Sequence, residues 1–426
     1  MPNGAATAHL ILPKIVTTLR EGYRAADFRR DAAAALTVAI VALPLSMAIA
    51  VASGVSPQRG LYTAIIGGFV VSALSGSRFQ IGGPAGAFIV LVAATVARFG
   101  LDGLVLTVFV SGVLLAICGF LRLGGLIRRI PASVTLGFTL GIATTIFVSQ
   151  IKDLTGLSVK GGLPSEFLPK LLALSQAWRS VNLSALGLGM AVVLIILGVR
   201  RFRPAWPSLL MAVVAATACA TLFGLPVETI GARFGQIPSG LPMPRIPAIS
   251  MARLVAILPT ALTFTLLGGV ESLLSAKVAD GMTGREHRPN MELVGQGFAN
   301  IASAFFGGIS VTGTIARTAT NIRAGAVSPV AGMLHALFVL IFLLVAAPLA
   351  SFTPLAVLSG VLVLVCANMT ELSEVRRVLG IWREAVPFGL TYLGTLAFDL
   401  TTGVVAGCLI AFMLSILPAK HEEAAH

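Results

Sequence analysis

Residues 57–76 read PQRGLYTAIIGGFVVSALSG, and residues 289–308 read PNMELVGQGFANIASAFFGG. Each stretch begins with proline, carries leucine four residues later and ends with glycine at the same spacing. A second pair of stretches, 131–137 and 354–360, begins with proline and ends with glycine six residues on. Taken together, the matches align the first half of the chain with the second and predict an internal repeat.

The composition around these stretches excludes a soluble globular protein. Of the 426 residues, 56% are hydrophobic and only 11% are charged, whereas soluble domains keep roughly a quarter of their residues charged. Apolar runs of about twenty residues are long enough to cross a bilayer as helices. Since alternating apolar and polar patterns are absent, helices rather than a barrel must satisfy the backbone. The fold class is therefore predicted to be an all-α membrane protein.

Apolar runs between polar residues predict fourteen membrane spans, seven in each half. Because seven is odd, the second half must insert upside down relative to the first, which makes the repeat inverted. The predicted span centres are Ile40, Phe69, Val90, Val110, Gly141, Val192, Ala215, Leu267, Ala299, Ala319, Leu340, Val361, Thr391 and Ile410.

The predicted organisation has five parts. They are a cytoplasmic amphipathic leader (1–32), a first repeat (33–225), an extracellular connector (226–250), a second repeat (251–418) and a cytoplasmic tail (419–426). The leader is predicted to lie along the cytoplasmic surface, because it is basic and amphipathic.

The basic residues indicate topology rather than nucleic-acid binding. The formal charge is +13, but Lys and Arg are scattered at the ends of apolar runs and form no continuous stripe. With both termini cytoplasmic, the fourteen-span arrangement puts 20 of the 30 Lys and Arg residues inside and 9 outside. This excess follows the positive-inside rule. We therefore predict a bacterial inner-membrane protein with no nucleic-acid partner.

No cofactor, metal or enzyme motif stands out. Cys118, Cys219, Cys366 and Cys408 occur singly within apolar runs, without metal or redox spacing, and are read as buried hydrophobic residues. No Ser/His pair or HExxH motif occurs at a usable spacing. We therefore expect neither cofactor, metal nor enzymatic activity.

Spans three and ten are short and begin with small or hydroxyl residues, GGPAG at 82–86 and SVTGT at 310–314. Such interrupted segments, in corresponding places of two halves, indicate the binding site of a transporter. A half-helix that begins in mid-membrane exposes unpaired N–H groups and the positive end of its dipole. Two such ends facing each other predict an anion site. The alternative is an ordinary loop followed by a tilted helix.

Arg317 lies in the first turn of the second short segment, where an intramembrane arginine is costly unless it is paired or lines a wet cavity. It is predicted to bind the anion with help from the hydroxyls of Thr312 and Thr314. Glu271, in span eight, is a candidate for taking up a proton as the anion binds. The alternatives are a structural Arg317 that bonds to carbonyls or pairs with Glu271, and a Glu271 that never cycles. His335 and Asn300 are read as helix-packing residues.

Three stretches resemble a known family. They are DFRRDAAAALTVAIVALPLSMAIAVASGVSPQRGLYTAIIGG at 27–68, HRPNMELVGQGFANIASAFFGG at 287–308, and SVTGTIARTATNIRAGAVSPVAGMLHAL at 310–337. Together they resemble SulP, the sulfate-permease-type anion transporters. The resemblance implies a core domain (spans 1–4 and 8–11), a gate domain (spans 5–7 and 12–14) and an elevator-like motion between them. It also implies a homodimer, and a substrate site between spans three and ten with help from spans one and eight.

The resemblance further implies which residues contact the substrate. Carried over position by position, they are Pro84, Ala85, Gly86, Thr314, Ile315, Ala316 and Arg317, with Glu271 from span eight.

The chain departs from the family pattern at several positions. Leu45 stands where glutamine is common, Ile49 where tyrosine is frequent, and Ala316 where the family has serine. The loss of a polar group beside the site weakens the case for sulfate itself. Most members carry a cytoplasmic STAS domain after the last span, and here it is expected to be absent or removed, since the sequence ends at His426.

The sequence thus predicts a secondary active transporter of a small anion, such as fumarate, bicarbonate or sulfate. Proton-coupled symport is the expected mode, with sodium as the other possible coupling ion. The alternatives are a passive anion channel, an anion exchanger and a nucleobase permease. A nucleobase permease usually carries an acidic residue in span ten, where this chain has Arg317.

Overall fold

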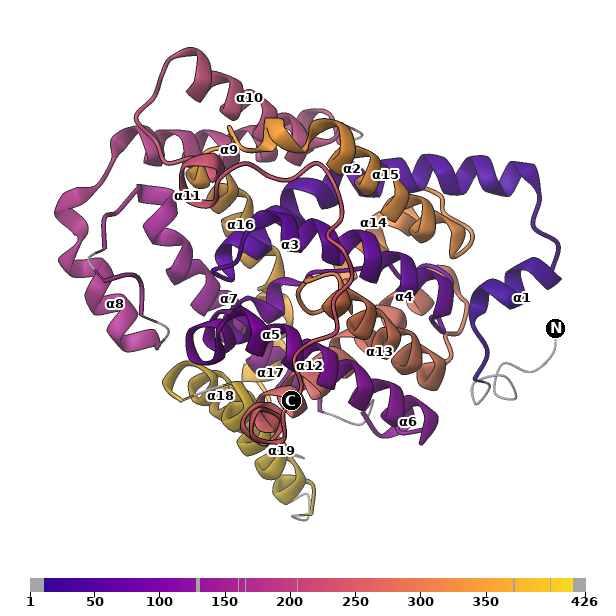
Figure 1. Cartoon of the computed structure of the whole chain (residues 1–426). Coiled ribbons are helices and arrows are strands. Elements are labelled where there is room, and N and C mark those ends of the chain that lie inside the picture. The colour runs from indigo at the N-terminus through magenta and orange to yellow at the C-terminus, as the bar shows by residue number, and fades with distance from the viewer. Residues whose placement is uncertain are drawn as a thin grey trace, which may run out of the picture.

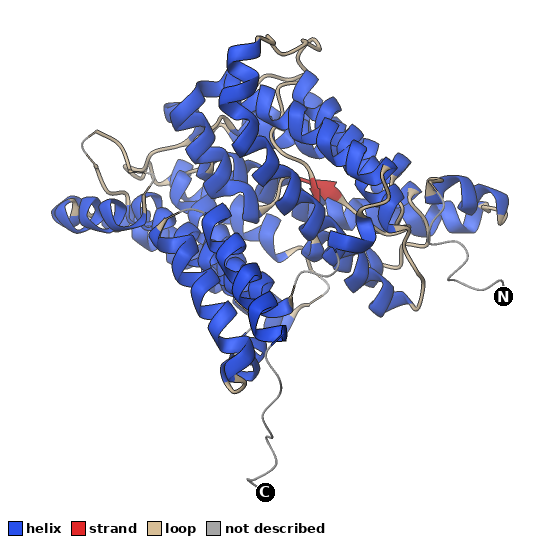
Figure 2. Ribbon diagram, turned by 90° about the horizontal axis from the view of Figure 1, so that it is seen from below, coloured by secondary structure: helices blue, strands red, loops and turns tan. Residues whose placement is uncertain are grey.

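The structure is a computed structural model in which helices account for nearly all of the regular structure (Figures 1 and 2). It describes residues 11–127, 131–159, 161–164, 166–204, 206–370, 372–398 and 400–416. The predicted cytoplasmic tail, 419–426, lies outside the described residues. The predicted all-helical fold class is confirmed.

The elements of the first half contain one short strand among helices. In chain order they are α1 (Lys14–Arg20), α2 (Ala25–Ala52), α3 (Pro57–Tyr62), the π-helical turn η2 (Thr63–Gly67), α4 (Gly68–Leu74), β1 (Gly82–Gly83), η3 (Gly86–Phe88), α5 (Ile89–Phe120), α6 (Gly124–Ile127), α7 (Ala132–Thr155), α8 (Phe167–Gln176), η4 (Trp178–Ser180), α9 (Leu183–Phe202), α10 (Ser208–Leu222) and α11 (Ile230–Phe234).

The second half contains the other short strand. Its elements are α12 (Met251–Thr283), α13 (Pro289–Phe305), β2 (Thr312–Gly313), α14 (Ile315–Arg323), α15 (Val330–Ala350), α16 (Leu355–Met369), α17 (Leu372–Leu379), α18 (Trp382–Ala397) and α19 (Leu400–Ile416).

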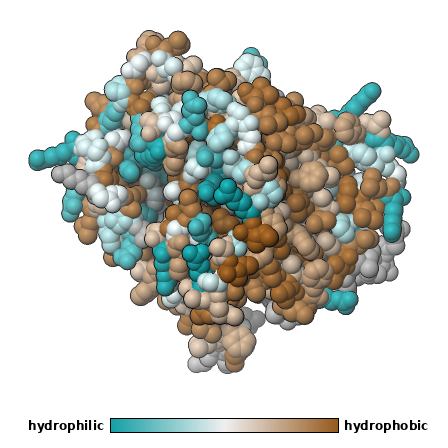
Figure 3. Space-filling model, in the orientation of Figure 1, coloured by the Kyte–Doolittle hydropathy of each residue, from teal (hydrophilic) through white to brown (hydrophobic). Residues whose placement is uncertain are grey.

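All fourteen predicted span centres lie in helices. In the described part of the chain, seven helices are long and apolar enough to cross a membrane, and Ser208–Leu222 and Thr402–Ile416 are shorter apolar helices. Apolar side chains cover a broad area of the surface, as Figure 3 shows. The chain is therefore a multi-pass membrane protein. The count of fourteen spans stays a prediction, since it depends on how the short helices sit in the bilayer.

Local sequence explains where several of these helices begin and end. The prolines that open the two repeated stretches, Pro57 and Pro289, occupy the first turns of α3 and α13, where a missing N–H costs nothing. Gly100 interrupts α5 with φ of 69°, a left-handed conformation that favours glycine. This break separates predicted span three from predicted span four.

The helices fall into two groups by packing. Helices α2 to α5 pack chiefly with one another and with α12 to α15, whereas α7, α9, α10, α16, α18 and α19 form the second group. Buried residues such as Val192 of α9 and Val361 of α16 belong to a hydrophobic cluster of the second group. The groups meet where α10 and α16 pack against α2 and where η3 packs against α7.

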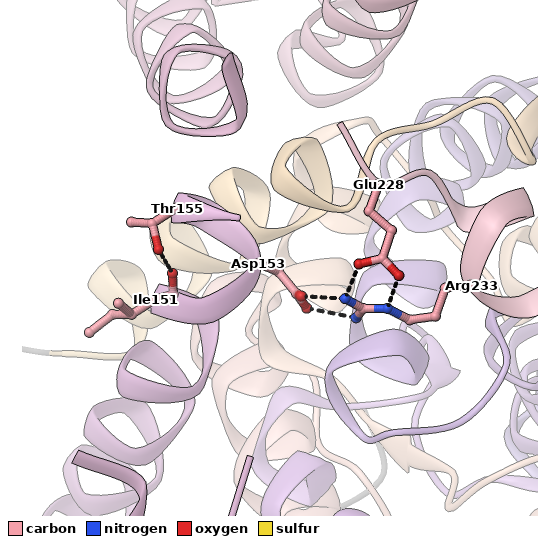
Figure 4. Close-up of polar contacts among 5 residues, drawn as sticks. All are labelled: Ile151, Asp153, Thr155, Glu228 and Arg233. Atoms are coloured by element: carbon pink, nitrogen blue, oxygen red, sulfur yellow. Dashed lines mark hydrogen bonds and ion pairs between the residues drawn. The ribbon is translucent and has the colours of Figure 1, made fainter. Parts of the chain in front are cut away.

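The connector between the two halves of the chain forms polar contacts with both groups of helices. Arg233 of α11 binds Asp153, at the end of α7, through Nη2 at 2.8 Å and Nη1 at 3.2 Å, and also binds Glu228 at 2.6 Å (Figure 4). Further along, the backbone N–H of Arg245 donates to the carbonyl oxygen of Phe305 at the end of α13 (2.8 Å). The connector therefore spans from α7, in the second group, to α13, in the first.

The N-terminal region differs from the predicted leader. Helix α1 covers only Lys14–Arg20, and α2 already begins at Ala25. The start of α2 is stabilised by the Asp27 carboxylate, which accepts a hydrogen bond from the backbone N–H of Arg24 at 3.0 Å. The last residues of the predicted leader therefore form the first turns of the long helix α2. Hydropathy does not detect this, because the turns before Ala33 carry four charged residues, Asp27, Arg29, Arg30 and Asp31.

Candidate functional site

The two short segments meet as a pair of antiparallel strands enclosed by helices (Figure 2). Gly82 pairs with Gly313 and Gly83 with Thr312, and the backbone N–H of Thr314 adds a hydrogen bond to the Ile81 carbonyl at 3.2 Å. Two segments more than two hundred residues apart in the sequence are thus paired just before the helices that follow them, η3 and α14.

Glycine is required in both strands, because Gly83 and Gly313 each leave space for a side chain from the other short segment. A Cβ on Gly83 would lie 2.0 Å from Nη1 of Arg317. A Cβ on Gly313 would lie 1.5 Å from Nε2 of Gln80. Both distances are far below van der Waals contact, so a larger residue in either strand would displace the polar group that it faces.

Both helix starts lack a side-chain cap. Ala85 precedes η3 and Thr314 precedes α14, and neither side chain accepts a hydrogen bond from the first turn. The Thr314 hydroxyl is buried and has no hydrogen-bond partner. The first N–H groups of each helix, together with its positive dipole end, therefore stay available to a negatively charged or oxygen-rich ligand.

Arg317 is buried beside these helix starts, with 1% of its surface exposed. Its Nη2 donates to the Ser46 hydroxyl at 3.2 Å and to the Pro84 carbonyl at 3.3 Å. Its Nε and Nη1 are buried and have no hydrogen-bond partner. Among the described residues no carboxylate lies within ion-pair distance of this guanidinium, so the alternative pairing with Glu271 is not formed.

Helix α12 closes the other side of the strand pair through Ser272. The Ser272 hydroxyl hydrogen-bonds the Thr312 hydroxyl at 2.9 Å and accepts a bond from the Gly313 N–H at 3.3 Å. The Thr312 hydroxyl is thereby engaged within the protein, unlike that of Thr314. Glu271 precedes Ser272 and is partly exposed, but its Oε2 is buried and has no hydrogen-bond partner.

The residues predicted for the site divide between buried and exposed positions. Pro84 and Ala85 are buried, and Ile315 is 41% exposed beside an exposed Ala316. Gly86 faces the second group of helices, since a Cβ there would lie 3.5 Å from Sδ of Met369 in α16. The structure thus brings the first short segment to Arg317 and to α16. No hydrogen bond or ion pair connects Glu271 to the other predicted residues.

Sequence reasoning missed Ser46, Gln80 and Ser272. Each is an uncharged polar residue, and hydropathy does not distinguish such residues from ordinary packing positions. Of the two predicted packing residues, Asn300 bonds both the N–H and the carbonyl of Val311, at 2.9 and 2.8 Å. His335 is fully buried, and neither ring nitrogen has a partner.

The described residues contain no group of three His, Cys, Asp or Glu side chains that could hold a metal ion. The groups without a partner at this candidate site are the Thr314 hydroxyl, two guanidinium nitrogens of Arg317 and the uncapped helix starts.

Comparison with known proteins identifies relatives over most of the chain. Residues 28–392 match the model of the sulfate permease family. "Putative sulfate transporter YvdB" of Bacillus subtilis is 42% identical over 93% of this chain and 75% of its own length. "Bicarbonate transporter BicA" of a Picosynechococcus species is 31% identical over 92% of this chain and 70% of its own length.

Solved structures resemble the fold closely. The transmembrane domain of a cyanobacterial bicarbonate transporter BicA matches with a TM-score of 0.79 and 30% identity, over 92% of this chain and 98% of that domain. The structure of SLC26A9 matches with a TM-score of 0.87 over 96% of this chain and 68% of that protein. At 18% identity, the second match concerns the fold alone.

Proposed function

The chain belongs to the sulfate permease family, and from this premise we propose that it is a secondary active transporter of a small oxyanion or carboxylate. Its relatives are transporters and not enzymes, and anion transport is the activity they share. Bicarbonate, sulfate and a dicarboxylate such as fumarate are the candidate substrates. Each presents oxygens that can accept the hydrogen bonds offered by the site.

The main support for anion transport is the unpaired, buried guanidinium of Arg317, which lies next to two uncapped helix starts. A buried charge without a counter-charge is strongly destabilising. An anion between η3 and α14 would supply that counter-charge and accept bonds from the first N–H groups and the Thr314 hydroxyl. Pro84, Ala85, Gly86, Ile315 and Ala316 would then contribute backbone and shape to the site rather than charge.

The packing of the helices supports an elevator-like mechanism. The strand pair and Arg317 belong to the group formed by α2 to α5 and α12 to α15, which we propose is the core domain. The second group would be the gate domain. Gly86 lies at the boundary, next to Met369 of α16, so the site would move along the gate surface as the core slides.

Glu271 is the proposed coupling residue. Its Oε2 has no partner, and it lies next to Ser272, which holds β2. A proton on this carboxyl would reduce the cost of leaving it unpaired. Anion binding next to Arg317 would favour that proton, since it would bring a second negative charge towards the carboxylate. Proton symport follows, with sodium as the alternative coupling ion.

The remaining expectations form part of the proposal. They are an inverted repeat with spans three and ten as half-helices, both termini on the cytoplasmic side of a bacterial inner membrane, and a homodimer. The two Pro-started helices α3 and α13 and the paired strands β1 and β2 support the repeat, because they occupy corresponding places in the two halves.

Two other functions use the same site. An anion exchanger or passive anion channel needs Arg317 and the helix starts but no coupling through Glu271. A nucleobase permease is disfavoured, because α14 reads IARTATNIR and contains no acidic residue to bind a base.

Tracer uptake into proteoliposomes tests the proposal. Sulfate, bicarbonate and fumarate would each be supplied with and without an inward proton gradient, and then with a sodium gradient. Uptake of one anion that rises with the proton gradient is the expected result. Uptake independent of both gradients would point to exchange or a channel, and failure to move any anion would overturn the transport proposal.

A further inference from the structure

Helix α1 docks on the core through its backbone and its charged side chains. The N–H of Lys14 donates to the Ser75 carbonyl at 3.0 Å, and Nη1 of Arg288 donates to the Leu12 carbonyl at 2.7 Å. Glu21, just after α1, forms an ion pair with Arg78. The helix is thereby fixed beside Arg78 and Arg288, which form a group of basic residues with its own Lys14.

Positive charge exceeds negative charge in this group. Among the described residues, neither Lys14 nor Arg288 has a carboxylate partner. The carboxylates near Lys14 are both bound elsewhere, Glu21 to Arg78 and Asp280 to His287, the latter at 2.5 Å. Two cations therefore lie close together, and neither has a carboxylate within ion-pair distance among the described residues.

Burial makes this arrangement costly. Arg288 is only 4% exposed, and its Nε is buried without a hydrogen-bond partner. Burial, then the neighbouring Arg288 and Arg78, lower the pKa of Lys14 to about 8. A bound anion would supply the missing acceptors and the missing negative charge.

The surroundings indicate where that anion comes from. Helix α1 lies at the edge of the molecule beside α4 (Figure 1). Its Leu19 is 59% exposed, and Ile11, three residues before the helix, is 38% exposed. Apolar side chains next to unpaired basic groups at the edge of a membrane protein are typical of contact with a lipid interface.

We propose that Lys14, Arg78 and Arg288 bind the phosphate group of an anionic phospholipid headgroup, with Ile11 and Leu19 against its acyl chains. The site is separate from the strand pair. It requires neither transport nor the identity of the transported anion.

The test uses the full chain reconstituted in nanodiscs of phosphatidylcholine with and without phosphatidylglycerol. Native mass spectrometry after mild extraction would measure the phosphatidylglycerol retained by the protein. Wild-type protein should retain it. Lys14→Gln should bind it roughly fivefold more weakly, and Lys14→Gln/Arg288→Gln on the order of thirtyfold more weakly.

Arg285→Gln is the matched control, because it removes one positive charge from an exposed residue of the loop that carries Arg288. It should retain phosphatidylglycerol as the wild type does. Equal losses in Lys14→Gln and Arg285→Gln would mean diffuse attraction and would overturn the site. Displacement of phosphatidylglycerol by free inorganic phosphate would overturn the lipid assignment. Lys14→Gln keeps the test valid if the double variant does not fold, since the Lys14 ammonium makes no hydrogen bond within the described structure.

Discussion

Nη2 of Arg317 lies 3.3 Å from the carbonyl oxygen of Pro84, so the charged group of one short segment is held by the backbone of the other. The same guanidinium occupies the space that a side chain on Gly83 would need. The two segments are therefore interdependent, and a change in either one should alter the position of the buried guanidinium between them.

Arg317→Ala should reduce anion uptake at least tenfold, since it removes the buried guanidinium next to the two helix starts. Folding should survive, because within the described part of the chain the guanidinium makes two hydrogen bonds and no ion pair. Tracer uptake together with size-exclusion chromatography checks both expectations. Arg323→Ala, an exposed arginine on the same helix, is the control and should transport normally. Normal uptake by Arg317→Ala would exclude a direct anion role.

Glu271→Gln should uncouple transport from the proton gradient. The amide has a similar shape but cannot take up a proton, so anion movement down its own gradient should persist while the response to an imposed pH difference is lost. Uptake at a series of inward proton gradients measures this. If the variant still followed the gradient, another residue would have to carry the coupling.

Gly83→Ala should impair transport and lower stability by about 1–3 kcal/mol, the usual cost of overpacking. The added methyl group would occupy the place of Arg317 Nη1 and push the guanidinium away from Pro84. Thermal unfolding in detergent and tracer uptake give the two readouts. Gly281→Ala in α12 is the control, because nothing lies within 4 Å of a Cβ there. Equal behaviour of the two variants would mean that the strand pair tolerates side chains.

Arg233→Gln should destabilise the protein by about 1–2 kcal/mol at neutral pH, because it leaves two neighbouring carboxylates without their shared cation. Thermal unfolding measures the loss. Arg377→Gln removes a cation shared by Glu374 and Glu384, but these side chains are largely exposed to solvent, so stability should stay nearly unchanged and the variant serves as the control. A similar loss in both variants would contradict a specific role for the Arg233 cluster.

The Arg233 cluster also predicts a pH dependence. Hydrogen bonds from Arg233 hold the pKa of Glu228 below its ordinary value of 4.5. A depressed pKa stabilises the fold above the ordinary value, and this contribution is lost as pH falls through the folded-state pKa. Wild-type stability should therefore fall in acid more steeply than that of Arg233→Gln. Melting temperatures from neutral pH to below pH 4.5 test this, and parallel curves would contradict it.

The sequence was sufficient to predict elements that depend on local composition. Apolar length predicts membrane helices because each helix satisfies its own backbone, and the fourteen centres all lie in helices. Glycine, proline and hydroxyl residues identified the two short segments, and Arg317 was recognisable because a lone charge in an apolar run has no local explanation. The helices outside the predicted spans, such as α8 and α17, were not anticipated.

Only the tertiary structure decided which of these residues meet. The register of Gly83 with Thr312, the bond from Arg317 to Ser46 and the closure of β2 by Ser272 join residues from distant parts of the chain. No local pattern encodes such pairs, because they arise from how whole helices pack. For the same reason, the sequence left open whether Arg317 pairs with Glu271, and the structure shows that this pair is not formed. The sequence thus determined which groups enter the membrane, and the packing of the helices determined which of them remain unpaired.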